Sequence, residues 1–127
     1  MIGSTRALRV WAYPSPCDLR KGYNGLYGLV ANVLGRDPLS GDLFLFCNRR
    51  RTICKVLTYD GTGLCIFQKR LESGRFAKLW MRGRSSRVVE LTATELSLFL
   101  EGCTLVGQQR LSPPAISART VDAKPWV

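Results

Sequence analysis

The chain contains no histidine, and its five cysteines include no C-x-x-C pair. A structural zinc site needs four clustered ligands, usually cysteine and histidine, so this composition argues against a zinc-binding domain. Histidine is also the commonest general acid or base near neutral pH, and that option is missing here. We therefore expect no cofactor, no metal and no enzyme activity.

Long apolar runs are also absent. No segment approaches the roughly 20 apolar residues that a membrane-spanning helix needs. The first residues, MIGSTRALRVW, lack the sustained apolar stretch of a secretion signal. We expect a soluble, cytoplasmic protein with no membrane partner.

The cysteine pattern agrees with a reducing compartment. An odd number of cysteines cannot pair completely within one chain, and three of them, Cys47, Cys54 and Cys65, lie in apolar runs. A free thiol in such a run packs as a small hydrophobe. We interpret the cysteines, which also include Cys17 and Cys103, as reduced thiols.

Acidic residues are scarce, and the resulting positive charge indicates a negatively charged partner. The chain has 9 Asp and Glu against 19 Lys and Arg, a formal net charge of +10, and 14 of the cations are arginines. A field of this sign accelerates encounter with any polyanion, and the planar arginine fork suits phosphate and guanine. DNA is the leading candidate, and RNA or an anionic membrane surface stays open.

The length and composition predict one folded domain. A chain of 127 residues with 46% hydrophobic content can bury a true core. We expect a single α+β domain over residues 1–111. Residues 112–127 begin with Ser112, Pro113 and Pro114 and show no periodicity, so we expect a disordered tail there.

Hydrophobic periodicity predicts a mostly antiparallel sheet with one helix after the first strand and a second short helix near the C-terminus. Asp18 is the expected N-cap of the first helix and Gly35 its end. A capping box at 92–95 opens the second helix, which runs through Leu100 and ends at Gly102. The expected strands cover residues 8–13, 43–47, 53–59, 64–69, 75–80 and 88–91.

The strands at 53–59 and 64–69 flank an Asp60-Gly61 turn and form a predicted hairpin, because glycine supplies the positive φ that such a turn needs. The hairpin carries cations and follows a run of three arginines. A two-stranded ribbon can enter the major groove of DNA, so base-edge contact by Arg70 is conceivable.

Cations gather at four places, each of which could contact phosphate or could simply be a solvated surface. The densest group lies between the second and third expected strands and at the start of the third, where the alternative is a solvated loop. A second group falls in the predicted first turn of the first helix, where cations oppose the helix dipole; backbone N–H groups and side chains there could grip a phosphate together. The others lie on or after the hairpin and in an arginine-rich loop. The candidate DNA-binding residues are Arg49, Arg50, Arg51 and Lys55; Arg20 and Lys21; Lys69, Arg70 and Arg75; and Arg82 and Arg84.

Two other functions remain open from the residues alone. Aromatic side chains could stack on unpaired bases, although most lie in apolar strands and are better explained as core. A small metal-dependent nuclease would need clustered carboxylates, for which Asp60 and Glu72 are the most suggestive pair. Both acids also have a simpler explanation, Asp60 in its turn and Glu72 beside Arg70 or Arg75.

Five blocks in a fixed order, with a shorter match at Leu100-Glu101-Gly102, carry a family resemblance that spans about Arg9 to Gly102. The chain resembles the small accessory proteins, called TnpB or Orf2-like, of bacterial insertion sequences of the insertion-sequence 66 family. It departs from their pattern at Thr52-Ile53-Cys54, where an acidic and a basic residue are usual, and at Tyr59, where tryptophan is frequent. The blocks are DLRKGYNGL (18–26), DPLSGDLFLF (37–46), NRRR (48–51), YDGTGL (59–64) and KRLESGRF (69–76).

The resemblance implies a non-catalytic accessory protein of DNA transposition that assists a separate transposase. The implied partners are DNA, either transposon ends or target, and the transposase with other proteins of the element. An alternative is a protein-interaction subunit of a transposase complex with little DNA contact of its own. The oligomeric state, the DNA sequence and the assisted step are not set by these residues.

Overall fold

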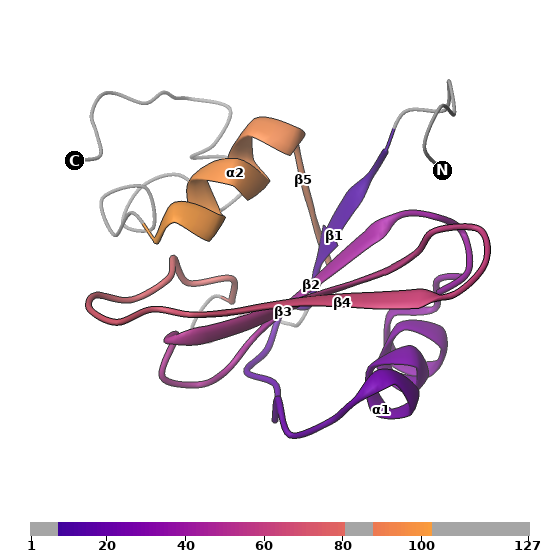
Figure 1. The fold of residues 1–127 in the computed structure, drawn as a ribbon, viewed down its shortest axis with the longest axis horizontal. Coiled ribbons are helices and arrows are strands. Elements are labelled where there is room, and N and C mark those ends of the chain that lie inside the picture. Colours follow the sequence, from indigo (N-terminus) through magenta and orange to yellow (C-terminus); the bar gives the residue numbers. More distant parts are fainter. Residues whose placement is uncertain (1–7, 81–87, 103–127) are drawn as a thin grey trace.

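Apolar side chains on both faces of the central strands make the sheet the middle of three layers. The computed structural model describes residues 8–80 and 88–102. Figure 1 shows the sheet nearly edge-on, with α1 (Tyr23–Gly28) on one face and α2 (Ala93–Glu101) on the other. We call these the α1 face and the α2 face. The expected α+β fold is confirmed.

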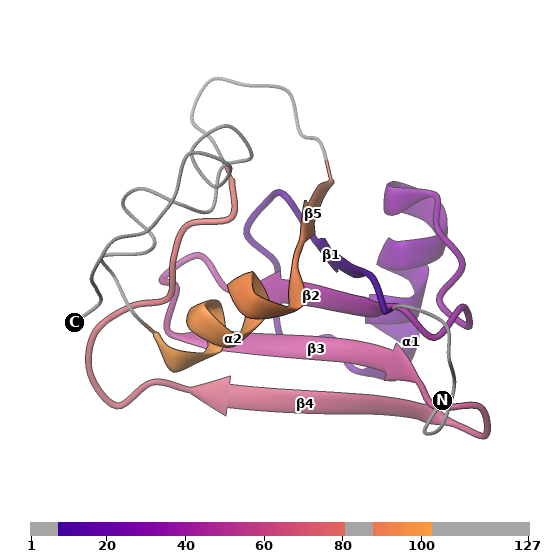
Figure 2. The ribbon, with the colours of Figure 1, turned by 90° about the horizontal axis from the view of Figure 1, so that it is seen from above.

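Five strands form one sheet in the order β4-β3-β2-β1-β5, seen from above in Figure 2. All neighbours run antiparallel except β1 and β2, which pair in parallel with Trp11 opposite Phe44. The apolar run at 43–47 is the central strand, as predicted. The strands are β1 (Val10–Ala12), β2 (Leu43–Cys47), β3 (Ile53–Tyr59), β4 (Leu64–Arg70) and β5 (Val89–Leu91).

Alternation along the strands divides the core between the two faces. On the α1 face, Phe44, Phe46 and Leu57 pack with Leu26 of the helix. On the α2 face, the core includes Phe99 of α2 and the segment after β4. Each helix thus covers one continuous apolar layer.

The first helix begins later than the sequence predicts. Gly22, not Asp18, is its N-cap, and α1 continues as a π-helical segment, η1 (Leu29–Leu34), that ends at Gly35 with φ 67°. The prediction of Asp18 as N-cap is wrong because its carboxylate accepts the backbone N–H of Arg20, two residues on, and forms a local turn. The predicted end at Gly35 is confirmed.

The predicted strand at 75–80 is also wrong. This segment pairs with no strand among the described residues, yet Phe76, Ala77 and Leu79 are buried. Phe76 stacks on Phe99 with ring centroids 4.9 Å apart, which explains its apolar character without a strand.

The second helix follows its prediction closely. Thr92 accepts the backbone N–H of Glu95, Glu95 accepts that of Thr92, and Gly102 ends the helix with φ 76°. The residues at 81–87, with the candidate cations Arg82 and Arg84, lie outside the described part of the chain, as does the expected tail at 112–127.

Three of the four described cysteines are buried, as expected: Cys17, Cys47 and Cys54 are free thiols in the core. Burial raises the pKa of Cys17 to about 11 and that of Cys54 to about 12, so both stay protonated. The expectation that Cys65 also packs as a small hydrophobe is wrong, because β4 presents this thiol to solvent on the α2 face. No helix within residues 8–80 or 88–102 is long and apolar enough to cross a membrane.

Candidate nucleic-acid interface

The turn between β2 and β3 presents two exposed cations, Arg49 and Arg50. Asn48 begins the turn and Arg51 closes it, with the backbone N–H of Arg51 donating to the carbonyl of Asn48 at 3.0 Å. The side-chain oxygen of Asn48 accepts the backbone N–H groups of Thr52 at 2.9 Å and Ile53 at 3.1 Å. This side-chain bracing fixes the turn that carries Arg49 and Arg50.

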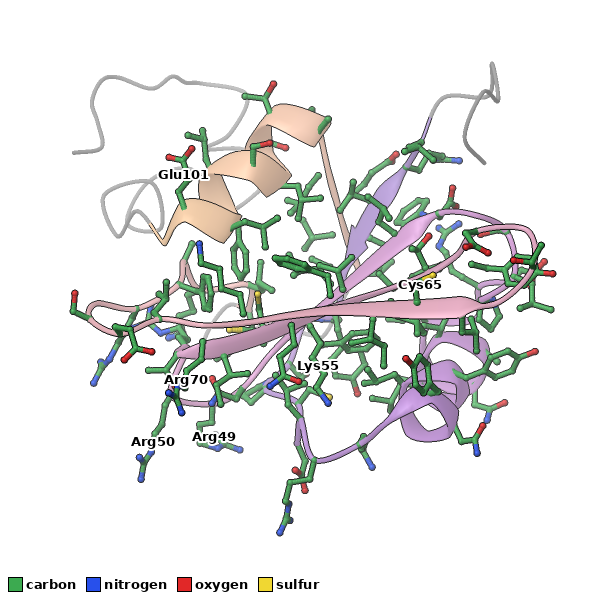
Figure 3. The ribbon with its side chains drawn as sticks, viewed as in Figure 1. Arg49, Arg50, Lys55, Cys65, Arg70 and Glu101 are labelled. Carbon is green, nitrogen blue, oxygen red and sulfur yellow. The ribbon has the colours of Figure 1, made fainter. Side chains whose placement is uncertain are left out.

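Arg49 and Arg50 occupy the two central positions of this turn and are exposed. Within residues 8–80 and 88–102, neither guanidinium makes a hydrogen bond or an ion pair. Figure 3 shows both on the α1 side of the sheet. A rigid turn with two unengaged guanidinium groups is prepared to contact an anion without first breaking an internal pair.

Arg51 has a different role from its two neighbours. It is the only non-glycine residue with positive φ in the described chain, at 62°. Its guanidinium donates to the carbonyl of Phe76 at 3.2 Å, and its own carbonyl accepts the Phe76 N–H at 2.7 Å. Arg51 therefore fastens the turn to the segment after β4, and its guanidinium is already engaged where those of Arg49 and Arg50 are not.

The segment before α1 forms the opposite wall. Cys17 is held to the end of β2 through its N–H, which donates to the carbonyl of Cys47 at 3.0 Å. Arg20 extends into solvent with its side chain 91% exposed, and its guanidinium pairs with Asp18 at 2.7 Å. That pairing, with the Arg20 backbone N–H, holds the pKa of the Asp18 carboxyl well below its usual range. Arg20 and Lys21 precede the helix, so the expected conflict with the helix dipole does not arise.

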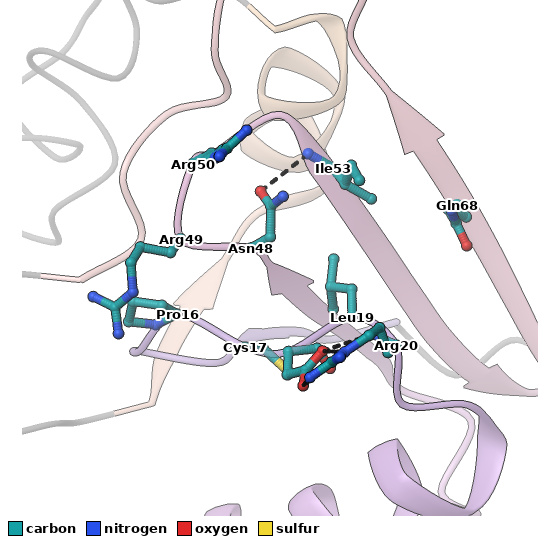
Figure 4. Close-up of a pocket in the computed structure, with 10 residues that line it drawn as sticks. Pro16, Cys17, Leu19, Arg20, Asn48, Arg49, Arg50, Ile53 and Gln68 are labelled. Atoms are coloured by element: carbon teal, nitrogen blue, oxygen red, sulfur yellow. Dashed lines mark hydrogen bonds and ion pairs between the residues drawn. The ribbon is translucent and has the colours of Figure 1, made fainter.

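These two walls enclose an open groove of about 590 Å³, shown in Figure 4. Its floor comes from β3 and β4 through Ile53 and Gln68. Three arginines line it, Arg20, Arg49 and Arg50, against one carboxylate, which is already paired with Arg20. The groove is a concave, cationic surface that suits phosphate.

Lys55 and Arg70 lie on the same side of the sheet (Figure 3). Lys55 is only 9% exposed, and its ammonium donates to the carbonyl of Lys21 at 2.9 Å, which links β3 to the segment before α1. Arg70 is exposed and makes a long, solvent-exposed contact with Glu72 at 3.4 Å. Lys55 thus adds positive potential from below the surface, whereas Arg70 can reach a ligand directly.

Lys69 points to the other face. Its ammonium donates to the carbonyl of Leu100 at 2.7 Å, near the C-terminal end of α2, where a cation compensates the helix dipole. Lys69 does not line the groove, because its ammonium is engaged at the end of α2. Arg75 is exposed in the segment after β4 and is not among the groove residues.

The two acids of the nuclease alternative do not meet. Asp60 lies before β4 and Glu72 after it, so roughly 20 Å of extended strand separates them. Asp60 accepts the backbone N–H groups of Thr62 and Gly63, which lowers its pKa to about 2. A metal pair shared by these two carboxylates is excluded by their spacing.

Sequence reasoning found Arg49 and Arg50 but missed Asn48, which braces them, and Gln68, which forms part of the floor. The signal for Asn48 was available: asparagine often bonds its own following backbone, and here it directly precedes the arginines. The prediction that the aromatics belong to the core holds for Trp11 and Phe76, which are 4% and 0% exposed, and is wrong for Tyr23 and Phe67, which are 51% and 52% exposed. Gln68 carries no comparable signal, since only strand register places it.

The chain is similar to proteins of a known family. A model described as IS66 Orf2 like protein matches residues 8–110. Two proteins of Sinorhizobium fredii (strain NBRC 101917 / NGR234), both called uncharacterized, are similar. The protein y4jC is 42% identical over 76 residues, 60% of this chain and 65% of y4jC, so the chain spans just under two thirds of it. The protein y4hO is 36% identical over 102 residues, 80% of this chain and 86% of y4hO.

No solved structure matches the chain at a significant level. The family match covers most of the sequence and includes every described strand and helix. The chain therefore belongs to the IS66 Orf2-like family.

Proposed function

We propose that this protein is a non-catalytic accessory factor that binds DNA through its α1 face and assists a separate transposase. The bound DNA would be a transposon end or the target. The observation that carries the proposal is the pair of exposed, unengaged guanidinium groups of Arg49 and Arg50 on a braced turn. The net charge of +10 supports it, because the long-range field has the same sign as the local site.

The proposed residues differ in how directly they would contact DNA. Arg49, Arg50 and Arg20 line the groove and would contact phosphates directly. Arg70 would reach an adjacent phosphate, since it lies on the same face and its contact with Glu72 is exposed and weak. Lys21 is exposed beside this surface, and Lys55 acts through its charge from within. Phosphate contacts position a protein on DNA without reading sequence, so modest sequence preference follows.

A salt series tests the proposal. We expect Arg49→Gln/Arg50→Gln to lower affinity for a transposon-end duplex about tenfold and to reduce the slope of log K against log salt by about 2, since each lost phosphate contact contributes about 0.9. The measurement is fluorescence anisotropy between low and moderate salt, with a random duplex in parallel.

The matched control removes two charges elsewhere. Lys69 contacts α2 on the other face and Lys78 is exposed outside the groove. Lys69→Gln/Lys78→Gln should weaken binding less than half as much on the logarithmic scale, with the slope nearly unchanged. Equal losses in both double variants would mean that net charge, not this turn, drives binding. A folded groove variant that binds like wild type would refute the site.

The main competing function is a protein-interaction subunit of the transposase complex. In that case the purified chain would bind DNA weakly, and binding to transposase would show little dependence on salt. The same anisotropy series, repeated with transposase and no DNA, separates the two functions.

A further inference from the structure

β4 is an end strand of the sheet, so one of its edges has no partner within the described chain. Two backbone bonds bracket the strand: Asp60 N–H donates to Gly63, and Leu71 N–H donates to Thr52. In an antiparallel pair, residues alternate between bonding the neighbour and facing away. This alternation directs the backbone N–H and C=O groups of four residues to the open edge: Leu64, Ile66, Gln68 and Arg70.

This edge has few of the features that protect a terminal strand from association. The strand is seven residues long, contains no proline, and pairs with β3 without interruption from Tyr59–Leu64 to Ile53–Arg70. Its cations fall only at its last two positions. Phe67 stands at its midpoint with 52% of its surface exposed. An exposed, regular edge with an apolar centre is a surface built for strand addition.

We propose that this edge pairs with β4 of a second copy of the chain, antiparallel, with Phe67 on the two-fold axis. In that register Ile66 bonds the partner's Gln68 and Leu64 bonds the partner's Arg70, so all four outward-facing residues are used. Phe67 meets the partner's Phe67 at a non-hydrogen-bonded position, where opposed side chains approach most closely.

The charges of β4 favour self-pairing in this register. Lys69 lies opposite the partner's Cys65, and Arg70 lies opposite the partner's Leu64, so no like charges are directly opposed. A register centred on Lys69 would oppose two ammonium groups and leave Phe67 unpaired. The strand is therefore complementary to itself around one residue, and this complementarity identifies a second copy as the occupant.

The symmetry of such a dimer connects with the proposed DNA surface, and this step rests on the proposed function. A two-fold axis between antiparallel strands is perpendicular to the sheet, so both α1 faces lie on the same side. The two Arg70 positions are then roughly 20 Å apart along the strand direction, six residues at about 3.4 Å each. Two grooves would face one duplex together.

Sedimentation equilibrium tests the dimer directly. We expect wild type to dimerise, and Phe67→Glu and Ile66→Pro to raise the dissociation constant at least tenfold while the circular dichroism spectrum stays unchanged. Proline at Ile66 removes an outward-facing N–H, which edge strands tolerate, but it also replaces an apolar side chain that packs on the α1-face core, so Phe67→Glu is the deciding variant. Leu39→Glu is the control, because it places the same charge at another exposed apolar residue and should dimerise like wild type.

Cross-linking supplies a positive test of the register. In a background with Cys65→Ser and Cys103→Ser, Phe67→Cys should form an intermolecular disulfide rapidly, since opposed residues at that position have suitable spacing. Leu39→Cys in the same background should not. A wild-type chain that stays monomeric at about 200 μM, or equal cross-linking at both positions, overturns the dimer.

The two proposals fail separately. Dimerisation of chains that each carry +10 should strengthen as salt screens repulsion, whereas DNA binding should weaken. A monomeric protein that still binds DNA would contradict only the proposed dimer. A dimer without DNA affinity would contradict only the proposed function.

Discussion

Two pairs of arginines on this protein behave differently in the fold. Arg9 and Arg36 cover Trp11, at 4.6 Å and 3.5 Å from the ring centroid, and Arg9 also pairs with Glu90 at 2.9 Å. Arg49 and Arg50, on the β2–β3 turn, contact no acid or ring among the described residues. The first pair stabilises the chain, and the second is available to a ligand.

Charge density alone therefore does not locate a binding surface. What matters is whether a guanidinium group must abandon an internal partner before it meets a phosphate. Leaving a cation–π contact or a bidentate ion pair costs free energy that a new contact has to recover. An unengaged side chain on a fixed turn has no such cost. The comparison therefore predicts that arginine substitutions separate into stability effects and binding effects.

Substitution of Arg36 should show the largest difference between its effect on stability and its effect on DNA binding. Arg36→Ala removes a guanidinium that covers the buried ring of Trp11 and should lower the free energy of unfolding by about 1–2 kcal/mol. Its effect on DNA affinity should be small. Urea denaturation followed by tryptophan fluorescence measures the first quantity, and anisotropy measures the second.

Arg50→Ala is the control for Arg36, with the opposite pattern. Its exposed side chain contributes within about 0.5 kcal/mol to stability, yet its loss should weaken DNA binding. If Arg36→Ala lowered affinity as strongly as Arg50→Ala in folded protein, the division between the two arginine pairs would be wrong.

Arg51 provides a finer test inside the arginine run itself. Arg51→Ala should cost about 1 kcal/mol of stability, because it removes the hydrogen bond to Phe76 and leaves the left-handed backbone in place. Arg51→Gly loses the same bond but relieves the positive φ, worth about 1 kcal/mol, so it should be less destabilising.

Thermal denaturation of Arg51→Ala and Arg51→Gly distinguishes the contribution of the hydrogen bond from that of the positive φ. DNA affinity should fall less for either variant than for Arg50→Ala. Arg51→Gly proving the more destabilising of the two would show that the backbone is not strained at this position.

The sequence predicts the sheet and hairpin well because strand period and turn chemistry are local. Leu43–Cys47 and Ile53–Tyr59 carry their apolar pattern within a few residues, and Asp60-Gly61 marks the turn between β3 and β4. The start of the first helix is predicted wrongly because Asp18 can either cap a helix or form a turn with Arg20, and the local sequence suits both. The contact of Cys17 with the end of β2 is non-local and favours the turn.

The candidate site follows the same division. Exposure of Arg49 and Arg50 can be anticipated from a charged run between strands. The separation of Arg51 and Lys69 from the cluster depends on Phe76 and Leu100, which lie 25 and 31 residues away. No pattern within the run reports such partners. Local sequence therefore locates a cationic turn, and tertiary contacts decide which of its cations are available.

The smallest effect concerns the one groove cation that is already engaged. Asp18→Asn should release Arg20 from its ion pair and remove a negative charge beside the groove, so DNA affinity should rise by a factor of about 2–5. Asp18→Asn/Arg20→Gln is the control and should abolish the gain. A fall in affinity for Asp18→Asn alone would mean that the pair positions Arg20 for binding.

The pH dependence of this pair has a definite sign. The folded-state pKa of Asp18 is lowered by Arg20, so the pair's contribution to stability is present above the ordinary carboxyl pKa and is lost as pH falls below it. The carboxylate stays ionised throughout pH 5–8, and the chain has no histidine that could titrate there. DNA affinity at fixed ionic strength should therefore be nearly flat between pH 5 and pH 8, in wild type and in Asp18→Asn alike. Anisotropy titrations across that range measure it, and a step near pH 6 would require an ionisable group outside the groove.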